Sequence, residues 1–183
     1  AANISADKIP VVAFSVGEEE LSGLDTSNLV GHLAAWNYFQ SAESDINSEF
    51  IKAWKARMGN KRVTNDPMEA HYIGFNMWVN AVKQAGTTNV DAVRTAMYGQ
   101  KFPNLTGGTA EMLTNHHLSK PVLIGEIKAD GQFDIISQTE PVPGDAWTDF
   151  LAESAVLKSD WKGLGCGMYN TNTKTCIQLK SNY

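Results

Sequence analysis

The hydrophobic residues of this chain follow a strand pattern near its start, a helical pattern in its middle and a strand pattern again beyond it. The first apolar run, residues 9–14 (IPVVAF), is short and continuous, which is typical of a strand buried in a parallel sheet. Ser15-Val16-Gly17 follows, and Glu18-Glu19-Glu20-Leu21 then predicts the start of a helix, because acidic residues in a first turn complement the helix dipole. Junctions of this kind are where α/β proteins hold small ligands. Because little sequence precedes this strand to supply its neighbours in a sheet, we expect the chain to begin within a larger protein.

Three helices are predicted in the middle of the chain. The first has an apolar stripe whose spacing fits 3.6 residues per turn, formed by Phe50, Ile51, Trp54 and Met58. The third covers residues 90–98 and is short, with Asn89 as its cap.

The second helix has the clearest boundaries. It begins at Asp66, which can cap it, with Pro67 in its first turn and Glu69 able to reach back as in a capping box. Gly86 ends it. We expect its buried face to carry Tyr72, Phe75, Val79 and Val82.

The segments on either side of the helices predict β structure. Residues 31–39 are apolar and aromatic without a helix cap, which indicates a strand or an extended crossover. Residues 121–127 and 132–136 flank Ala129-Asp130-Gly131, and Asp-Gly between two such runs is a strong signal for a hairpin. The fold class is therefore α/β, with an incomplete sheet.

Composition excludes several classes of protein. With 183 residues, of which 43% are hydrophobic and 19% charged, the chain can form a globular core. The net charge of −5 and the lack of a dense Lys/Arg stripe argue against nucleic acid as a partner. No window has the apolar length of a membrane span, and the N-terminus lacks the features of a secretory signal.

Two cysteines, Cys166 and Cys176, lie near the C-terminus on either side of a segment with polar turn residues that can form a hairpin. A disulfide closing so short a loop contributes about 2–3 kcal/mol by the chain-entropy estimate. Such a bond favours an oxidising, extracytoplasmic location. Two free thiols, or half of a zinc site, are the alternatives, although no second Cys/His pair lies at ligand spacing.

Several strings of residues together resemble a known family. IPVVAFSVGEEEL, VGHLAAWNYF, NDPMEAHYIGFNMW, NHHLSKPVLIGEI and ADGQF, in this order, are similar to the C-terminal half of the urea-binding proteins of bacterial ABC importers. These proteins belong to the type I periplasmic binding proteins, together with relatives that bind amides and branched-chain amino acids. The resemblance implies a two-lobed α/β fold of which this chain holds only the C-terminal portion, with segments of both lobes.

The same resemblance implies a division of the chain. Residues 1–150 would be the C-terminal portion of the binding protein, with 1–35 and 118–140 in the C-terminal lobe and 45–110 packing on the N-terminal lobe. Residues 151–183 would be a tail with the disulfide hairpin. The implied partners are urea or a small amide, the membrane subunits of an ABC permease, and the N-terminal half of the same protein in the periplasm.

The candidate ligand site starts from the chemistry of urea, which offers one carbonyl acceptor and several N–H donors. The Ser15-Val16-Gly17 loop supplies a hydroxyl, amides at a helix start and an unobstructed approach at Gly17, and the resemblance implies that Ser15 contacts the ligand. The alternative for Ser15 is that it caps the helix. Tyr72 corresponds to an aromatic that relatives place against the ligand, although the core is an equal alternative. Asp66 and Glu69 are acceptors for urea nitrogens, with capping as their alternative, and Trp36 and Tyr38 are candidates for the cleft wall or for ordinary packing.

Enzyme chemistry has little support in the residues. The chain has no G-x-S-x-G elbow, metal-ligand pair or phosphate loop. His116 and His117 are adjacent, and neighbours in an extended segment point to opposite faces, so a shared metal is not expected. We therefore predict a binding protein without cofactor or metal. An amide sensor of the same fold and, in a different class, an amide hydrolase are the alternatives.

Overall fold

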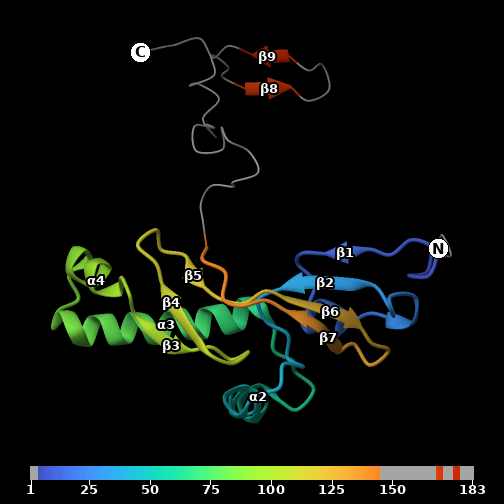
Figure 1. Cartoon of the computed structure of the whole chain (residues 1–183), viewed down its shortest axis with the longest axis horizontal. Helices are drawn as coiled ribbons and strands as arrows, with labels where there is room; N and C mark the ends of the chain where they lie inside the picture. The colour runs from blue at the N-terminus through green and yellow to red at the C-terminus, as the bar shows by residue number, and fades with distance from the viewer. Residues whose placement is uncertain (1–3, 145–167, 171–174, 178–183) are drawn as a thin grey trace. The chain divides into compact units, whose positions relative to one another are not determined.

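The computed structural model describes residues 4–144, 168–170 and 175–177 of the chain (Figure 1). The chain divides into two compact units, Ala1–Gly144 and Asp145–Tyr183, and each is described by itself below. Within the described ranges, no helix has both the length and the apolar character needed to cross a membrane.

A four-stranded sheet, in the order β1-β2-β6-β7, forms one end of the first unit. Its strands are β1 (Val12–Ala13), β2 (Leu33–Trp36), β6 (Leu123–Ile127) and β7 (Phe133–Gln138). β1 runs parallel to β2, as predicted, and the other neighbours pair antiparallel. The prediction that the first strand is buried is wrong. β1 lies at the edge of the sheet, and Phe14, which follows it, is 76% exposed.

The β6–β7 hairpin forms where the sequence predicts it. The Lys128 amide donates to the Gln132 carbonyl across the turn (2.9 Å), and Gly131 has φ 74°, which suits glycine. The core beneath the sheet contains Phe39 and Phe133, whose rings stack at 4.3 Å between centroids. Gly125 lies against both rings, since an added Cβ would come within 2.9 Å of Phe133 and 3.0 Å of Phe39.

The helices have the expected order, with some different ends. A short helix α1 (Glu18–Leu21) and a 3-10 turn η1 (Thr26–Asn28) link β1 to β2, and α2 (Asp45–Met58) follows β2. Helix α3 (Asp66–Ala85) ends at Gly86, which has the left-handed φ of 63°, and α4 (Val90–Met97) has the predicted Asn89 cap.

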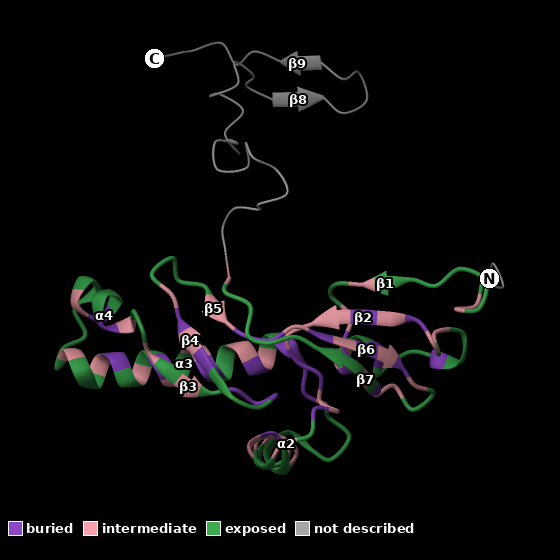
Figure 2. Ribbon diagram, in the orientation of Figure 1, coloured by how far each residue is buried: buried purple, intermediate pink, exposed green. Residues whose placement is uncertain are grey.

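The buried face of α3 differs from the prediction. Ile73, Met77 and Ala81 are fully buried, whereas Phe75 is 55% exposed. Figure 2 shows buried and exposed stretches alternating along this helix. Tyr72 is also exposed, and Val79 and Val82 are half-buried. The helix is apolar on more than one face, so its sequence period does not identify the face that meets the core.

A second sheet, which the sequence did not reveal, covers the buried face of α3. It has the order β3-β4-β5 and is antiparallel, with β3 (Lys101–Pro103), β4 (Thr109–Met112) and β5 (Leu118–Ser119). Ala110 and Met112 of β4 pack with Ile73 and Met77 of α3.

The described part of the second unit consists of two strands. β8 (Met168–Asn170) and β9 (Thr175–Ile177) pair antiparallel, with Tyr169 opposite Cys176. Cys166 lies outside the described residues, so its bond to Cys176 stays a prediction.

Candidate functional site

The candidate site lies at the carboxyl ends of β1 and β2. These two strands are parallel, with Val12 opposite Leu33 and Ala13 opposite Ala34, so both end at the same edge of the sheet. The Ser15–Gly17 loop follows β1 there, and Asn37 follows β2. In open α/β sheets, ligands bind outside this edge.

The Ser15–Gly17 loop leaves the Ser15 side chain accessible. Gly17, not Ser15, occupies the N-cap position of α1, so the capping alternative for Ser15 is wrong. Ser15 is exposed, Val16 is half-buried and Gly17 is buried. The Gly17 amide is already engaged, because it donates to Glu20 Oε2 at 2.9 Å. The loop therefore offers the Ser15 hydroxyl, while the Gly17 amide holds the loop in place.

Trp36 forms a wall beside this loop. Its ring lies close to Gly17, where an added Cβ would approach Trp36 Cζ3 at 3.4 Å. Trp36 is half-buried and packs on the core of the first sheet. Tyr38, two residues on, is fully buried, and its hydroxyl bonds Asn47 Oδ1 (2.8 Å) and Thr64 Oγ1 (2.7 Å). Packing thus accounts for Tyr38, whereas Trp36 both packs and borders the loop.

Glu18 is a buried acid that sequence reasoning took only as part of an acidic first turn. It is 1% exposed, and its Oε1 accepts from the Ser41 amide (3.3 Å) and hydroxyl (3.4 Å). Its Oε2 has no hydrogen-bond partner among the described residues. Burial raises the pKa of Glu18 to about 7, against the lowering effect of its hydrogen bonds. The sequence offered no signal for this, because Glu19 and Glu20 beside it look the same.

Asp66 and Glu69 are both buried in the first turn of α3, but neither caps it as expected. Asn65 is the N-cap, and its side chain accepts from the Met68 amide at 3.3 Å. Asp66 Oδ2 accepts from the Asn37 amide at 3.0 Å, which brings α3 to the end of β2. Glu69 Oε2 pairs with Lys120 Nζ. Burial raises the pKa of both carboxyls, and the Lys120 charge opposes this rise.

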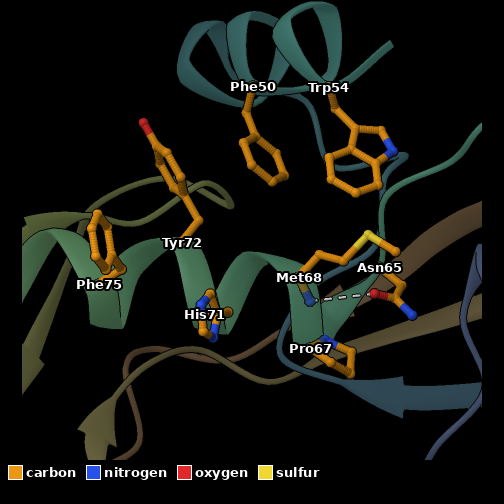
Figure 3. Close-up of a pocket in the computed structure, with 8 residues that line it drawn as sticks. All are labelled: Phe50, Trp54, Asn65, Pro67, Met68, His71, Tyr72 and Phe75. Atoms are coloured by element: carbon orange, nitrogen blue, oxygen red, sulfur yellow. Dashed lines mark hydrogen bonds between the residues drawn. The ribbon is translucent and has the colours of Figure 1, made fainter. Parts of the chain in front are cut away.

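Tyr72 lies in a different place, on an open groove between α2 and α3 (Figure 3). In Figure 3, Phe50 and Trp54 point from α2 towards α3, where Met68 and Tyr72 face them. The groove has a volume of about 820 Å³ and is lined by Phe50, Trp54, Asn65, Pro67, Met68, His71, Tyr72 and Phe75. The Tyr72 ring packs against the rings of Phe50 and Phe102, with 4.9 Å and 5.9 Å between the ring centroids. The Ser15–Gly17 loop does not line this groove.

The structure therefore brings the predicted residues to two places. Ser15, Val16, Gly17 and Asp66 lie around the ends of β1 and β2, and Glu69 lies one turn along α3 from Asp66. Tyr72 belongs to the groove. The described residues contain no group of three or more His, Cys, Asp or Glu side chains that could hold a metal ion. His116 instead contacts Tyr98, with 3.3 Å between His116 Nε2 and the hydroxyl.

Comparison with known proteins identifies the class to which this arrangement belongs. Residues 1–153 match the family described as periplasmic binding protein domain. Since this match covers most of the chain, the chain belongs to that family.

This chain spans between 35% and 38% of the length of the solved structures with a similar fold that are described here. One is a solute-binding protein of an ABC transporter from Rhodopseudomonas palustris BisB5 in complex with 3,4-dihydroxybenzoic acid, with 19% identity, a TM-score of 0.65, and coverage of 73% of this chain and 38% of that chain. Another, from R. palustris in complex with benzoate, has 16% identity, a TM-score of 0.65, and coverage of 76% and 38%. A leucine-binding protein from Thermotoga maritima has 18% identity, a TM-score of 0.56, and coverage of 67% and 35%. The shared fold is that of the type I periplasmic binding proteins.

A sequence relative carries a different name. A Geobacillus stearothermophilus protein named limonene hydroxylase is 33% identical over 134 residues, which are 72% of this chain and 24% of that protein. The chain thus spans about a quarter of this relative, and the relative's name refers to the full-length protein.

Proposed function

We propose that this chain is part of an extracytoplasmic solute-binding protein that captures urea or a short-chain amide for an ABC importer. The observation that carries the proposal is the exposed Ser15 in a loop whose Gly17 lies against Trp36, at the carboxyl edge of two parallel strands in a periplasmic binding protein fold. A binding protein of this kind works by closing one lobe over the ligand, so the proposal includes a second lobe that completes the site.

The ligand class follows from the polar groups at this edge. A neutral amide needs donors for its oxygen and acceptors for its nitrogens, and Ser15 can serve as either. Trp36 supplies a flat apolar wall, which suits a small planar molecule. The cation at this edge, Lys120, is buried and already paired with Glu69, which favours a neutral ligand over a carboxylate such as benzoate. Direct contacts of Asp66, Glu69 and Tyr72 with the ligand remain predictions.

The groove between α2 and α3 supports the two-lobed arrangement. Its lining is mostly apolar and includes Phe75, which is 55% exposed, beside Trp78 at 45%. Exposed apolar surfaces of this kind mark sites of contact with another protein surface. We propose that the N-terminal lobe of the same protein covers this groove, and that the assembled protein delivers its ligand to the permease subunits.

The test uses the complete gene product that contains these residues. Isothermal titration with urea, formamide and acetamide is expected to give saturable heat, whereas benzoate and leucine are expected to give none. Ser15→Ala is expected to weaken urea binding by about 1 kcal/mol or more, because the substitution leaves a buried ligand group unpaired. Ser137→Ala, an exposed serine on β7, is the matched control and should not change the affinity.

Three outcomes would contradict the proposal. Heat from benzoate or leucine without heat from the amides would assign a different ligand. Unchanged affinity of Ser15→Ala would remove this residue from the site. Release of ammonia on incubation with the amides would replace the binding protein by a hydrolase, since a binder raises the melting temperature with ligand but does not turn it over.

A further inference from the structure

Three chain segments leave the first sheet at the same edge and run beside one another. The first begins at Asn37 after β2, the second is residues 120–122 before β6, and the third is residues 139–142 after β7. The Asn37 side chain donates to the Pro121 carbonyl (2.8 Å), which joins the first segment to the second. The Thr139 amide donates to the Val122 carbonyl (2.9 Å), which joins the second to the third. The segment at 120–122 is therefore the middle one.

Lys120 ties this middle segment to its surroundings in two ways. The Lys120 amide donates to the Val142 carbonyl (3.2 Å), and the Val142 amide donates to the Lys120 carbonyl (2.8 Å). The Lys120 side chain is only 7% exposed and pairs with Glu69, which is fully buried. The third segment and helix α3 are thus both attached to one residue.

The first segment is attached to the same turn of α3. Asp66 precedes Glu69 by three residues and accepts from the Asn37 amide at 3.0 Å. One lysine therefore faces two buried carboxyls, and each carboxyl engages a different segment that leaves the sheet. Burying these charges costs desolvation energy, and a buried ion pair is weak evidence for stability. Such a pair does restrict geometry, because either partner left alone would be a buried, uncompensated charge.

We propose that Lys120 is a positioning residue that sets the orientation of the first sheet, with its Ser15 loop, relative to helix α3. It does so without touching the ligand, through Glu69 on one side and Val142 on the other. The consequence for ligand affinity rests on the proposed function. The consequence for the three segments does not, because it can be measured without ligand.

The test compares Lys120→Met and the double variant Lys120→Met/Glu69→Met in the complete gene product. Amide hydrogen exchange without ligand is the first measurement. In the double variant, which buries two apolar side chains in place of the ion pair, the melting temperature is expected to stay near that of the native protein. The Asn37 and Val142 amides are nevertheless expected to exchange about tenfold faster, while Ile73 and Met77 in the core keep their native rates. Lys101→Met, which breaks the exposed Lys101–Glu111 pair, is the control and should change none of these amides.

Urea affinity is the second measurement, and it is expected to fall about tenfold in Lys120→Met, which keeps the candidate ligand contact Glu69. Native exchange at Asn37 and Val142 in the double variant would overturn the proposal, because the pair would then not hold these two segments in place. Faster exchange at every amide would overturn it too, since the effect would be global. If the native protein does not bind urea, the proposed function fails, whereas the exchange experiment still decides the role of Lys120.

Discussion

Replacing Glu18 by glutamine is expected to stabilise the protein in a way that depends on pH. The pKa of Glu18 rises from 4.5 to about 7 on folding, because burial disfavours the charged carboxylate. Between these values the unfolded state binds fewer protons than the folded state, so stability falls as pH rises. By linkage this costs about 3 kcal/mol at pH 8 and less than about 0.5 kcal/mol at pH 4.5. Glutamine keeps an oxygen for Ser41 and carries no charge, so it removes this cost.

Unfolding by guanidinium chloride at pH 4.5 and pH 8 measures the effect, and urea is avoided because it is the proposed ligand. Tryptophan fluorescence follows the transition, and one of the five tryptophans, Trp36, packs against the core of the first sheet. Glu18→Gln is expected to gain about 3 kcal/mol over the native protein at pH 8 and little at pH 4.5. Glu49→Gln, an exposed glutamate on α2, should show no such difference between the two pH values. An equal gain at both pH values, or a Glu18 carboxyl that titrates near 4.5 by NMR, would refute the reasoning.

Two further predictions concern packing and the cysteine pair. Gly125→Ala should destabilise the protein by about 1–3 kcal/mol, because the new methyl group would lie 2.9 Å from Phe133 in a filled core. Guanidinium unfolding measures this effect. A midpoint equal to that of the native protein would contradict the prediction, because the core would then accommodate the methyl group. Cys166 and Cys176 are expected to form a disulfide, so thiol titration of the denatured, unreduced protein should find no free thiol, and two free thiols would contradict the bond.

Local signals in the sequence predict much of this fold because the forces behind them act within a few residues. Asn89 caps its helix, Gly86 ends another with a left-handed φ, and Asp130-Gly131 turns the β6–β7 hairpin, all as predicted. Each outcome depends on a backbone preference or a hydrogen bond to a near neighbour. The resemblance to periplasmic binding proteins adds the order of these elements, and the family match agrees with it.

The second sheet and the buried face of α3 illustrate what local signals miss. β3, β4 and β5 have four residues at most and show no strong alternation. They are stable as strands because they pair with each other and cover Ile73 and Met77. Helix α3 has apolar side chains on more than one face, so its buried face depends on where this small sheet packs.

The sequence by itself determined the class of fold, the end of α3 at Gly86, the Asn89 cap of α4 and the position of the Ser15–Gly17 loop after the first strand. Only the tertiary structure decided which charges are buried and which partners they have. Lys120 and Glu69 lie 51 residues apart, and Glu18 meets Ser41 across 23 residues. Desolvation and pairing of these groups depend on contacts between distant segments, and no local spacing encodes such contacts. That is why Glu69 looked like a cap and Glu18 like one of three equivalent surface acids until the chain was folded.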